Sequence, residues 1–372
     1  MYTAEVFGGA RELRKYHPLL RPVIQYFVPA LRTLKYREAK AYELVASIAA
    51  ARNDGLSLHG WEKEVGREKE GRNRGKVGDM LDWFRHNILA SDLENRERQV
   101  KFQLALSMVS IHTTSMSATH AIFDLAARPE YLDPLRKEVL GFIKDKGGGG
   151  GGAAREGMDR RRLRMPRNSG PLHLSGMMPR LDSFMKESLR CNPPGMVQFA
   201  RKIYKPFTLS DGTFISAGTR LGVAANTINK DPSVYGPNAD KFDGFRFYDM
   251  RKKEENEEGG DTKSLFTSTS PTTSLTFGYG KHACPGRFFA ANEIKILLVV
   301  FLRDYEVRMP LQDGKDGSGG SGGGGGDGGG GDDDDDGGPT RDEDGRWENI
   351  VDGMSILCNF GGEVEVRRRG GG

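Results

Sequence analysis

Five segments of the chain carry patterns typical of helices. The strongest covers residues 93–127. Ser91 and Glu94 form a capping box at its start, and Pro129 lies just beyond its end. The complete set of predicted helices covers residues 35–52, 93–127, 133–146, 178–190 and 285–302.

The centre of the strongest helix, residues 104–118, has small, hydroxyl and apolar residues all round and no formal charge. A helix without a solvated face is typical of a domain's interior, so we expect this part to be buried. It contains His112, Thr113 and Thr114, whose polar groups cost free energy when buried unless they find hydrogen-bond partners.

After residue 192 the pattern favours short strands and turns. Residues 202–215 predict a hairpin around the turn signal Asp211-Gly212, and residues 219–225 resemble a buried strand. Residues 229–250 are rich in turn signals, and the stretches around 354–360 and 364–366 predict a closing hairpin. The expected fold class is therefore mainly α with small β-sheets.

A proline-punctuated apolar segment lies near the start of the chain, at residues 17–34. Pro18, Pro22 and Pro29 exclude one long helix and leave short turns. Basic residues flank the segment, so it could rest on a membrane surface. A buried connection between helices is an equal alternative.

The amino-acid composition excludes some classes of protein but does not identify a function. Three cysteines among 372 residues exclude a disulfide-stapled secreted module. Residues 313–344 hold eleven acidic and two basic side chains, which leaves about +13 on the rest of the chain. That charge could attract nucleic acid, anionic lipid or an acidic protein, and it does not choose among them.

The predicted organisation is one domain over residues 1–312 with a flexible insertion at 147–177, a disordered insertion at 313–345, and a final hairpin of the same domain at 346–369.

The candidate chemistry lies in residues 277–287, which read Phe-Gly-Tyr-Gly-Lys-His-Ala-Cys-Pro-Gly-Arg. Pro285 is expected at a first helical position, which would place Cys284 at a helix N-terminus that favours a thiolate. The neighbouring glycines let the backbone fold tightly and a flat ligand approach. A lone thiolate with His282 nearby suits a haem iron and its carboxylates. A buried cysteine in a glycine turn would explain Cys284 alone, but not the whole string.

This string resembles the signature of the cytochrome P-450 haem-thiolate monooxygenases, F-x-x-G-x-[R/H]-x-C-x-G. The matching positions are Phe277, Gly280, His282, Cys284 and Gly286. The resemblance implies a cytochrome P-450 fold with haem b as cofactor and Cys284 as the axial thiolate ligand of its iron.

Two further landmarks of that family lie upstream in the expected order. Glu187 and Arg190 match E-x-x-R, and residues 242–247 match the aromatic loop that carries Arg246. The resemblance implies that Glu187, Arg190 and Arg246 form a buried triad that locks the cysteine loop. The alternative for Glu187 and Arg190 is a surface pair one helical turn apart.

Residues 109–114 match the family's oxygen-activating helix, [A/G]-G-x-[D/E]-T-[T/S]. The resemblance implies that Thr113 hydrogen-bonds dioxygen and relays protons. His112 replaces the usual carboxylate, as in fungal members of the ent-kaurene-oxidase and polyketide-hydroxylase kind. A histidine with a pKa of about 6.5 can still shuttle protons. Alternatively, the threonines are core residues that bond back to helix carbonyls.

Other positions carry over more weakly. Arg201 and His282 are candidates to bind the haem propionates, and Cys191 and Cys358 are expected to be free buried thiols. Candidates for the substrate pocket are Ile111, Ser115, Met196, Val197 and Met354.

The resemblance implies a monooxygenase that oxidises an apolar small molecule, such as a fungal terpenoid or polyketide. It implies O2 as co-substrate, an NADPH-dependent flavoprotein reductase as partner and no nucleic-acid partner. The resemblance begins in the middle of the family's fold, so we expect a domain incomplete at its N-terminus. If an anchor precedes it, the expected location is the cytosolic face of the endoplasmic reticulum membrane. Two alternatives stay open: a non-catalytic remnant, or a haem enzyme that uses peroxide or isomerises an oxygenated substrate.

Overall fold

The structure is a computed structural model that describes residues 2–55, 95–147, 177–255, 265–311, 340–352 and 355–369. Several predictions concern residues outside these ranges: the capping box of Ser91 and Glu94, nearly all of the insertion at 147–177, most of the insertion at 313–345, and Met354. The chain divides into two compact units, Met1–His112 and Thr113–Gly372, which are described separately.

The first unit is helical in its described part. It contains α1 (Tyr2–Arg14), α2 (Arg21–Ile24), α3 (Pro29–Gly55) and the first half of α7 (Arg96–Ala127). The helix predicted over 35–52 begins six residues earlier, at Pro29, because proline's fixed φ suits the first turn of a helix. α1 packs against α3 at Gly9, where a Cβ atom would collide with the side chain of Leu31.

The second unit contains the remaining helices and all described strands. Its helices are the second half of α7, η1 (Pro129–Tyr131), α8 (Leu132–Gly147), α9 (Pro179–Cys191), α10 (Ala225–Asn229), α11 (Pro232–Tyr235), α12 (Arg246–Glu255), η4 (Gly280–His282) and α13 (Arg287–Asp304). Its strands are β1 (Gln198–Lys202), β2 (Phe207–Thr208), β3 (Phe214–Ile215), β4 (Arg220–Val223), β5 (Tyr305–Arg308), β6 (Ile350–Asp352), β7 (Ser355–Leu357) and β8 (Glu365–Arg368).

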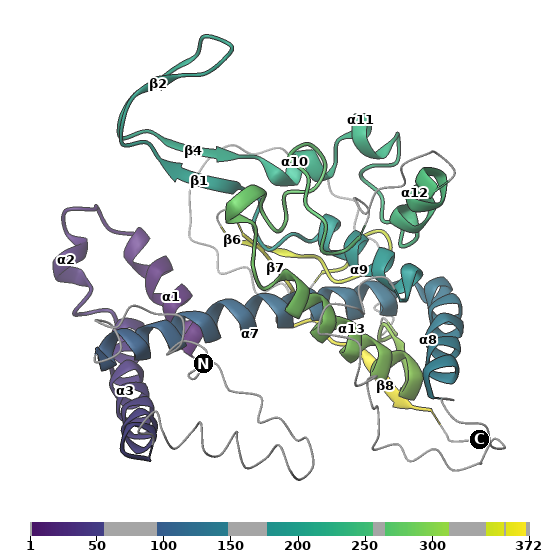
Figure 1. Cartoon of the computed structure of the whole chain (residues 1–372), viewed down its shortest axis with the longest axis horizontal. Coiled ribbons are helices and arrows are strands. Elements are labelled where there is room, and N and C mark those ends of the chain that lie inside the picture. Colours follow the sequence, from purple (N-terminus) through teal and green to yellow (C-terminus); the bar gives the residue numbers. More distant parts are fainter. Residues whose placement is uncertain are drawn as a thin grey trace, which may run out of the picture. The chain divides into compact units, whose positions relative to one another are not determined.

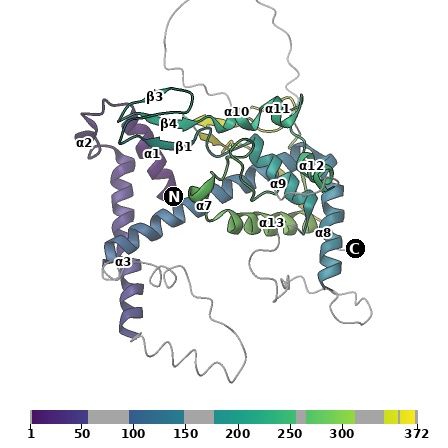
Figure 2. The ribbon, with the colours of Figure 1, turned by 45° about the horizontal axis from the view of Figure 1, so that its top comes forward.

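Four helices supply most of the second unit's apolar core. The C-terminal part of α7 runs beside α13 (Figures 1 and 2), and both pack with α8 and α9. Fully buried members include Leu125 of α7, Leu135 of α8, Phe184 of α9 and Leu298 of α13. The four helices predicted here from the sequence are therefore confirmed, and their apolar faces meet.

The described strands form four antiparallel pairs, β1–β4, β2–β3, β5–β8 and β6–β7. The hairpin expected at 202–215 is present as β2–β3, although Lys202 belongs to β1 instead. The strand over 219–225 is present as β4 but is mostly exposed, so the prediction of burial was wrong. The expected closing hairpin was also wrong in its pairing: β7 pairs with β6, whereas β8 returns to β5 at the end of α13.

Helix α9 is buried throughout residues 181–190 although half of its side chains are polar or charged. Asp182 and Lys295 of α13 are both fully buried, and their Oδ1 and Nζ atoms lie 2.7 Å apart. The other carboxylate oxygen of Asp182 accepts a hydrogen bond of 2.9 Å from the backbone N–H of Phe266. Buried charges are stable only when paired and hydrogen-bonded in this way, so the pairing fixes α9 against α13.

The start of α9 is capped by a side chain from another helix. Met178, the residue at the N-cap position, provides no side-chain oxygen. Instead, Glu138 of α8 accepts hydrogen bonds from the backbone N–H groups of Arg180 and Leu181, at 2.9 and 2.8 Å. A carboxylate at a helix N-terminus satisfies free donors and interacts favourably with the helix dipole.

We predict that Asp182→Ala destabilises the protein strongly, because the fully buried Lys295 would lose its ion pair of 2.7 Å with Asp182. The expected loss in free energy of unfolding is about 3–5 kcal/mol, measured by urea denaturation. The matched control is Asp133→Ala, since Asp133 has 85% exposed side-chain surface and lies 3.7 Å from Arg136. Its loss should stay below about 1 kcal/mol. Equal losses in the two variants would contradict the role of the buried pair.

Candidate functional site

The loop that carries Cys284 is shaped by glycines. Gly278 and Gly280 have φ values of +71° and +67°, a region that side-chain-bearing residues rarely adopt. The loop closes where the N–H of Cys284 donates to the carbonyl of Phe277 at 2.7 Å. The ring of Phe277 packs edge-on against Phe266, which anchors the loop to the core.

The helix after this loop begins later than expected. Gly286 occupies the N-cap position and α13 starts at Arg287, so Cys284 lies two residues before the cap. The prediction that Pro285 opens the helix directly after Cys284 was wrong, because the first helical hydrogen bond joins Ala290 N–H to the carbonyl of Gly286. The carbonyl of Cys284 instead accepts a hydrogen bond from Arg287 Nη1 at 2.8 Å.

Cys284 differs from the other two cysteines in its surroundings. All three are free, as expected for Cys191 and Cys358. Burial raises the pKa of Cys191 to about 12 and also raises the pKa of Cys358 above its ordinary value. Both therefore remain protonated near pH 7, and a protonated thiol is a poor metal ligand. Cys284 is half-buried, as Cys191 is, but it lies in the glycine-rich loop rather than at the end of a buried helix.

The residues of the cysteine loop fit a flat, thiolate-bound cofactor. A Cβ atom on Gly286 would lie 3.9 Å from Cys284 Sγ, so any side chain there would fill space next to the sulfur. Glycine leaves that space open to a planar ligand. Among the described residues, no group of three or more His, Cys, Asp and Glu side chains gathers to hold a metal ion.

The structure brings Glu187, Arg190 and Arg246 together in the interior. Arg190 binds Glu187 through two parallel hydrogen bonds of 2.7 Å, and Arg246 Nε lies 3.2 Å from Glu187 Oε1. Glu187 is fully buried and the two arginines nearly so, so the alternative of a surface pair was wrong. Burial opposes the charge of Arg190, but the hydrogen bond and the charge of Glu187 raise its pKa above the ordinary value.

Both guanidinium groups of this triad donate hydrogen bonds to backbone carbonyls of one segment, residues 229–241. Arg190 donates to the carbonyls of Asn229, Ala239 and Lys241, and Arg246 donates to those of Tyr235, Asn238 and Lys241. The distances lie between 2.6 and 3.0 Å. The triad therefore fastens this loop directly rather than the cysteine loop.

Tyr235 extends the triad toward the cysteine loop, and the sequence analysis missed it. Its ring lies under the guanidinium of Arg190, 5.0 Å from the ring centre, and its hydroxyl donates to the carbonyl of Thr273. Burial raises the pKa of Tyr235 to about 12, which keeps this donor protonated. Phe277, the first residue of the cysteine loop, lies four residues after Thr273 in the sequence. No local pattern identifies Tyr235, since only the fold brings it next to Arg190.

We predict that Glu187→Gln destabilises the protein by about 3–5 kcal/mol, because two buried guanidinium groups would lose their only shared counter-charge among the described residues. Urea denaturation measures the loss. The matched control is Glu365→Gln, since Glu365 pairs with Arg308 at the surface. There the expected loss is below about 1 kcal/mol. A small loss for Glu187→Gln would show that the buried triad does not hold the second unit together.

The residues expected on the oxygen-activating helix lie in the middle of α7, and several are exposed. Thr113 and Ser115 are exposed, and Ile111 exposes 65% of its surface. The prediction that residues 104–118 are buried was therefore wrong for one face. The opposite face, with Thr114, Met116 and Ala118, is buried.

His112 is half-buried, and burial lowers its pKa below the ordinary value of about 6.5. Its imidazole is therefore mainly neutral at pH 7, so one ring nitrogen can donate a proton and the other can accept one. Back-bonding to helix carbonyls is present in this part of α7: Ser117 Oγ donates to the carbonyl of Thr113 and Thr119 Oγ1 to that of Ser115, both at 2.9 Å.

The remaining predicted positions are dispersed. Arg201 is exposed on β1 and donates to the carbonyl of Ala200, and His282 is exposed at the end of η4. Met196 and Val197 are half-buried just before β1, where Val197 lies against Gly222 of β4. These four residues form no common hydrogen-bond network, and Met354 lies outside the described residues.

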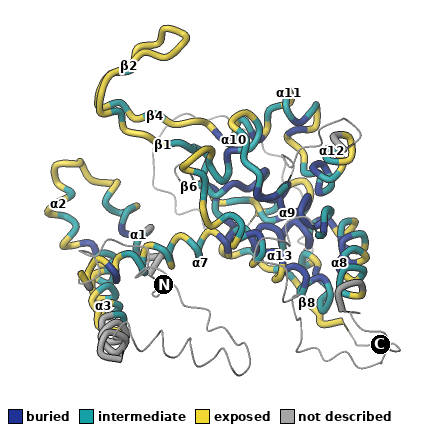
Figure 3. Tube along the Cα trace, in the orientation of Figure 1, coloured by how far each residue is buried: buried dark blue, intermediate teal, exposed yellow. Residues whose placement is uncertain are grey.

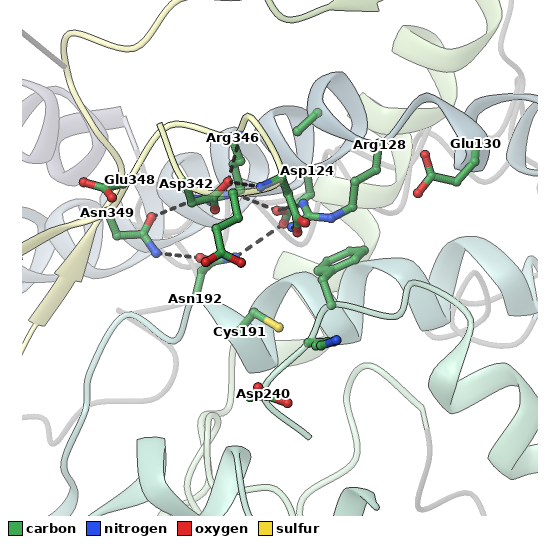
Figure 4. Close-up of a pocket in the computed structure, with 15 residues that line it drawn as sticks. Asp124, Arg128, Glu130, Cys191, Asn192, Asp240, Asp342, Arg346, Glu348 and Asn349 are labelled. Carbon is green, nitrogen blue, oxygen red and sulfur yellow. Dashed lines mark hydrogen bonds and ion pairs between the residues drawn. The ribbon is translucent and has the colours of Figure 1, made fainter. Parts of the chain in front are cut away.

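A pocket of about 870 Å³ lies at the C-terminal ends of α7 and α9 (Figure 4), and it does not include Cys284. Its floor is a polar network. Asp124 Oδ1 accepts from Arg346 Nε at 2.7 Å and from Arg128 Nη1 at 3.1 Å, and Asp124 Oδ2 accepts from the hydroxyl of Ser188 at 2.6 Å. Acidic residues outnumber basic ones in the lining, which includes Asp124, Glu130, Asp240, Asp342, Glu343, Asp344, Glu348, Arg128, Lys241 and Arg346.

His120 joins this network from the interior. Its Nδ1 atom lies 2.8 Å from Arg346 Nη2. Because an arginine can only donate, Nδ1 must accept, and a neutral ring then carries its proton on Nε2. Nε2 is buried and has no partner among the described residues. Burial, and then the charge of Arg346, lower the pKa of His120 to about 3.

We predict that His120 makes the fold sensitive to acid. Its folded pKa of about 3 lies below the unfolded value of about 6.5, so between these values the unfolded chain binds more protons and stability falls as pH falls. The slope is at most about 1.4 kcal/mol per pH unit. Urea denaturation at pH 7.5, 5.5 and 4.5 should show a flatter dependence in His120→Gln than in the parent, whereas the exposed-site control His17→Gln should keep the parental slope. Identical slopes in all three proteins would contradict this role.

Comparison with known proteins identifies relatives over most of the chain. The cytochrome P-450 family model matches residues 91–323. The chain is 35% identical over 317 residues to the cytochrome P-450 monooxygenase braC of Annulohypoxylon truncatum, which covers 82% of this chain and 54% of that protein. It is 33% identical over 309 residues to a cytochrome P-450 monooxygenase of Emericella nidulans, and 34% identical over 316 residues to an ent-kaurene oxidase of Gibberella intermedia. These matches cover 83% and 84% of this chain and 51% of each relative, so the chain spans about half the length of the curated relatives it matches.

Proposed function

Since the chain belongs to the cytochrome P-450 family, we propose that it contributes the thiolate side of a haem-dependent monooxygenase. The observation that carries this proposal is the cysteine loop: a free, half-buried thiol in a turn that requires two glycines of positive φ. The predicted fold class, mainly α with small β-sheets, is confirmed by the family match.

The haem would supply the activation of dioxygen, and the chain would position it and its reactants. Cys284 would bind the iron through Sγ, with the space next to Gly286 left open for the ring. Arg201 and His282, both exposed, would bind the propionates. Thr113, through its hydroxyl, and His112, through its mainly neutral imidazole, would pass protons along the exposed face of α7.

The substrate class and the electron source are finer parts of this proposal. An apolar secondary metabolite suits the exposed Ile111 beside Ser115 on α7, with Met196 and Val197 as further lining and Met354 assigned by resemblance only. One relative is named an ent-kaurene oxidase, and the proposed substrate of this chain is a terpenoid or a polyketide. Electrons would come from NADPH through a flavoprotein reductase.

A second candidate is a remnant that folds without binding haem. The exposed face of α7 favours it, because Thr113 and Ser115 face solvent rather than an enclosed pocket. The two candidates differ in haem uptake: stoichiometric binding of added haem by the purified chain supports the first, and no uptake supports the second.

We predict that the purified chain with added haem, once reduced and exposed to carbon monoxide, shows the difference band of a thiolate-bound haem, and that Cys284→Ala abolishes it. Cys191→Ala and Cys358→Ala are matched controls, since burial raises the pKa of both thiols and neither lies in the cysteine loop. Both controls should keep the band. A band that survives in Cys284→Ala would assign the ligand to another residue and overturn the proposal.

A further inference from the structure

The sequence contains a single serine or threonine that is followed by proline. Ser270 precedes Pro271, and each of the other prolines among the 17 follows a residue without a hydroxyl group. The ring of a proline keeps the residue before it in extended backbone conformations, which suits the extended peptide that a protein kinase binds. Ser270-Pro271 is therefore the one position in the sequence with the form of a proline-directed phosphorylation site.

Ser270 begins a tight turn at the surface of the second unit. Pro271 and Thr272 are exposed, and Ser270 itself is half-buried. Two backbone hydrogen bonds between Ser270 and Ser274 close the turn, with N to O distances of 2.9 and 3.2 Å. Pro271 suits the position after Ser270 because its fixed φ matches the first inner residue of a turn. A kinase that binds its acceptor in extended form opens this bridge of two hydrogen bonds.

The hydroxyl of Ser270 lies among hydrogen-bond donors that suit an anion. Its Oγ accepts from the backbone N–H groups of Thr272 and Thr273, both at 3.3 Å, and lies 3.3 Å from Thr272 Oγ1. These distances are long for bonds from N–H groups, so the neutral hydroxyl uses the two donors only weakly. A phosphate on Oγ carries three strong acceptor oxygens and about two negative charges, so it forms shorter, charge-assisted bonds with the same donors.

The sequence around the turn carries no carboxylate side chain. Residues 262–292 contain no Asp or Glu, but they contain Lys263, Lys281 and Arg287. A phosphate beside Asp or Glu is opposed by like-charge repulsion. Within this segment no such repulsion arises, and the phosphate would add negative charge to a stretch whose net charge is positive.

Buried side chains anchor the turn on both sides. Before the turn, Lys186 Nζ donates to Ser268 Oγ at 2.6 Å, and after it the hydroxyl of Tyr235 donates to the carbonyl of Thr273. Lys186 belongs to α9, whose trace is dark blue, and therefore buried, in Figure 3. A phosphate bound to the N–H of Thr273 would act on the same residue that Tyr235 holds, just before the cysteine loop.

We propose that Ser270 is the acceptor for a proline-directed Ser/Thr protein kinase, and that its phosphate closes over the N–H groups of Thr272 and Thr273. The co-reactant is ATP with Mg²⁺. The bond from Ser270 Oγ to the γ-phosphorus forms as the bond between that phosphorus and ADP breaks, and the hydroxyl proton passes to a base of the kinase. The phosphate then stabilises the turn, and with it the contact between Tyr235 and the backbone that leads into the cysteine loop.

Phosphate incorporation into the purified full chain tests the acceptor. A cyclin-dependent protein kinase with radiolabelled ATP should label the parent and Ser270→Thr, which keeps the hydroxyl group. Ser270→Ala should lose the label, and Pro271→Ala should lose most of it. The matched control is Ser274→Ala, since Ser274 is the other half-buried serine of the bridge and is followed by leucine. The control should be labelled as the parent is, and mass spectrometry of its peptides should locate the phosphate at Ser270.

Thermal unfolding tests the closure of the phosphate over the N–H groups. The phosphorylated parent should melt about 2–4 °C above the unphosphorylated parent, because the charge-assisted bonds exist only in the folded chain. Ser270→Ala, treated with the same kinase and ATP, should keep its melting temperature.

Several outcomes would overturn the proposal. No label in the parent, or parental labelling of Ser270→Ala, would exclude Ser270 as the acceptor. Undiminished labelling of Pro271→Ala would exclude the proline-directed class of kinase, and an unchanged or lower melting temperature of the phosphorylated parent would exclude the closure. Circular dichroism checks that each variant keeps the parental helix content. All of these measurements are made without haem, so their failure would leave the proposed haem chemistry untouched.

Discussion

The second unit depends on a helix that buries charges. Every residue of α9 from 181 to 190 is buried, and its charged side chains bind segments that lie far from it in the sequence. Asp182 binds α13, Lys186 donates to the carbonyl of Leu265, and Glu187 binds the two arginines that hold the loop at 229–241. Burial makes an unpaired charge costly, so each loop must return to a single position for the helix to be stable. The segments at 229–241 and around Leu265 are held against α9 in this way.

The contacts of the buried charged side chains of α9 also position the cysteine loop. The backbone N–H of Phe266 donates to Asp182, and the ring of Phe266 packs against Phe277, while Tyr235 links Arg190 to the backbone of Thr273. Both connections end within eleven residues of Cys284. Near the C-terminal end of α9, Asp124 forms ion pairs with Arg346 and Arg128. The pair with Arg346 attaches the segment after residue 340. The apolar core gives the second unit its cohesion, and the buried charges determine where its loops lie.

Local sequence patterns predicted the helices and strands better than they predicted which of these elements contact one another. The helices over 93–127, 133–146, 178–190 and 285–302 follow from periodicity and from proline or cap signals, and the cysteine string follows from composition within ten residues. The pairing of β8 with β5 could not be read locally, since about 60 residues separate the two strands. The triad was expected from a resemblance, but its direct hold on residues 229–241 depends on carbonyls, which every residue carries and no sequence pattern distinguishes. We expected residues 104–118 of α7 to be buried on all sides, but an apolar helix face shows only that a packing partner would be favourable.

The three cysteines lie in different surroundings. Cys191 directly follows Arg190, yet burial and the nearby Glu187 raise its pKa to about 12, so the cation beside it does not produce a thiolate. Cys358 lies in a small apolar cluster with Met116 and Phe123, and burial also raises its pKa. Cys284 is the thiol placed where side chains are small: Gly278 and Gly280 bend the backbone, and Gly286 leaves the space beside the sulfur open. Small neighbouring residues, rather than proximity to a charge, therefore distinguish Cys284 from the other two cysteines, and under the proposed function these glycines would give a flat ligand access to its sulfur.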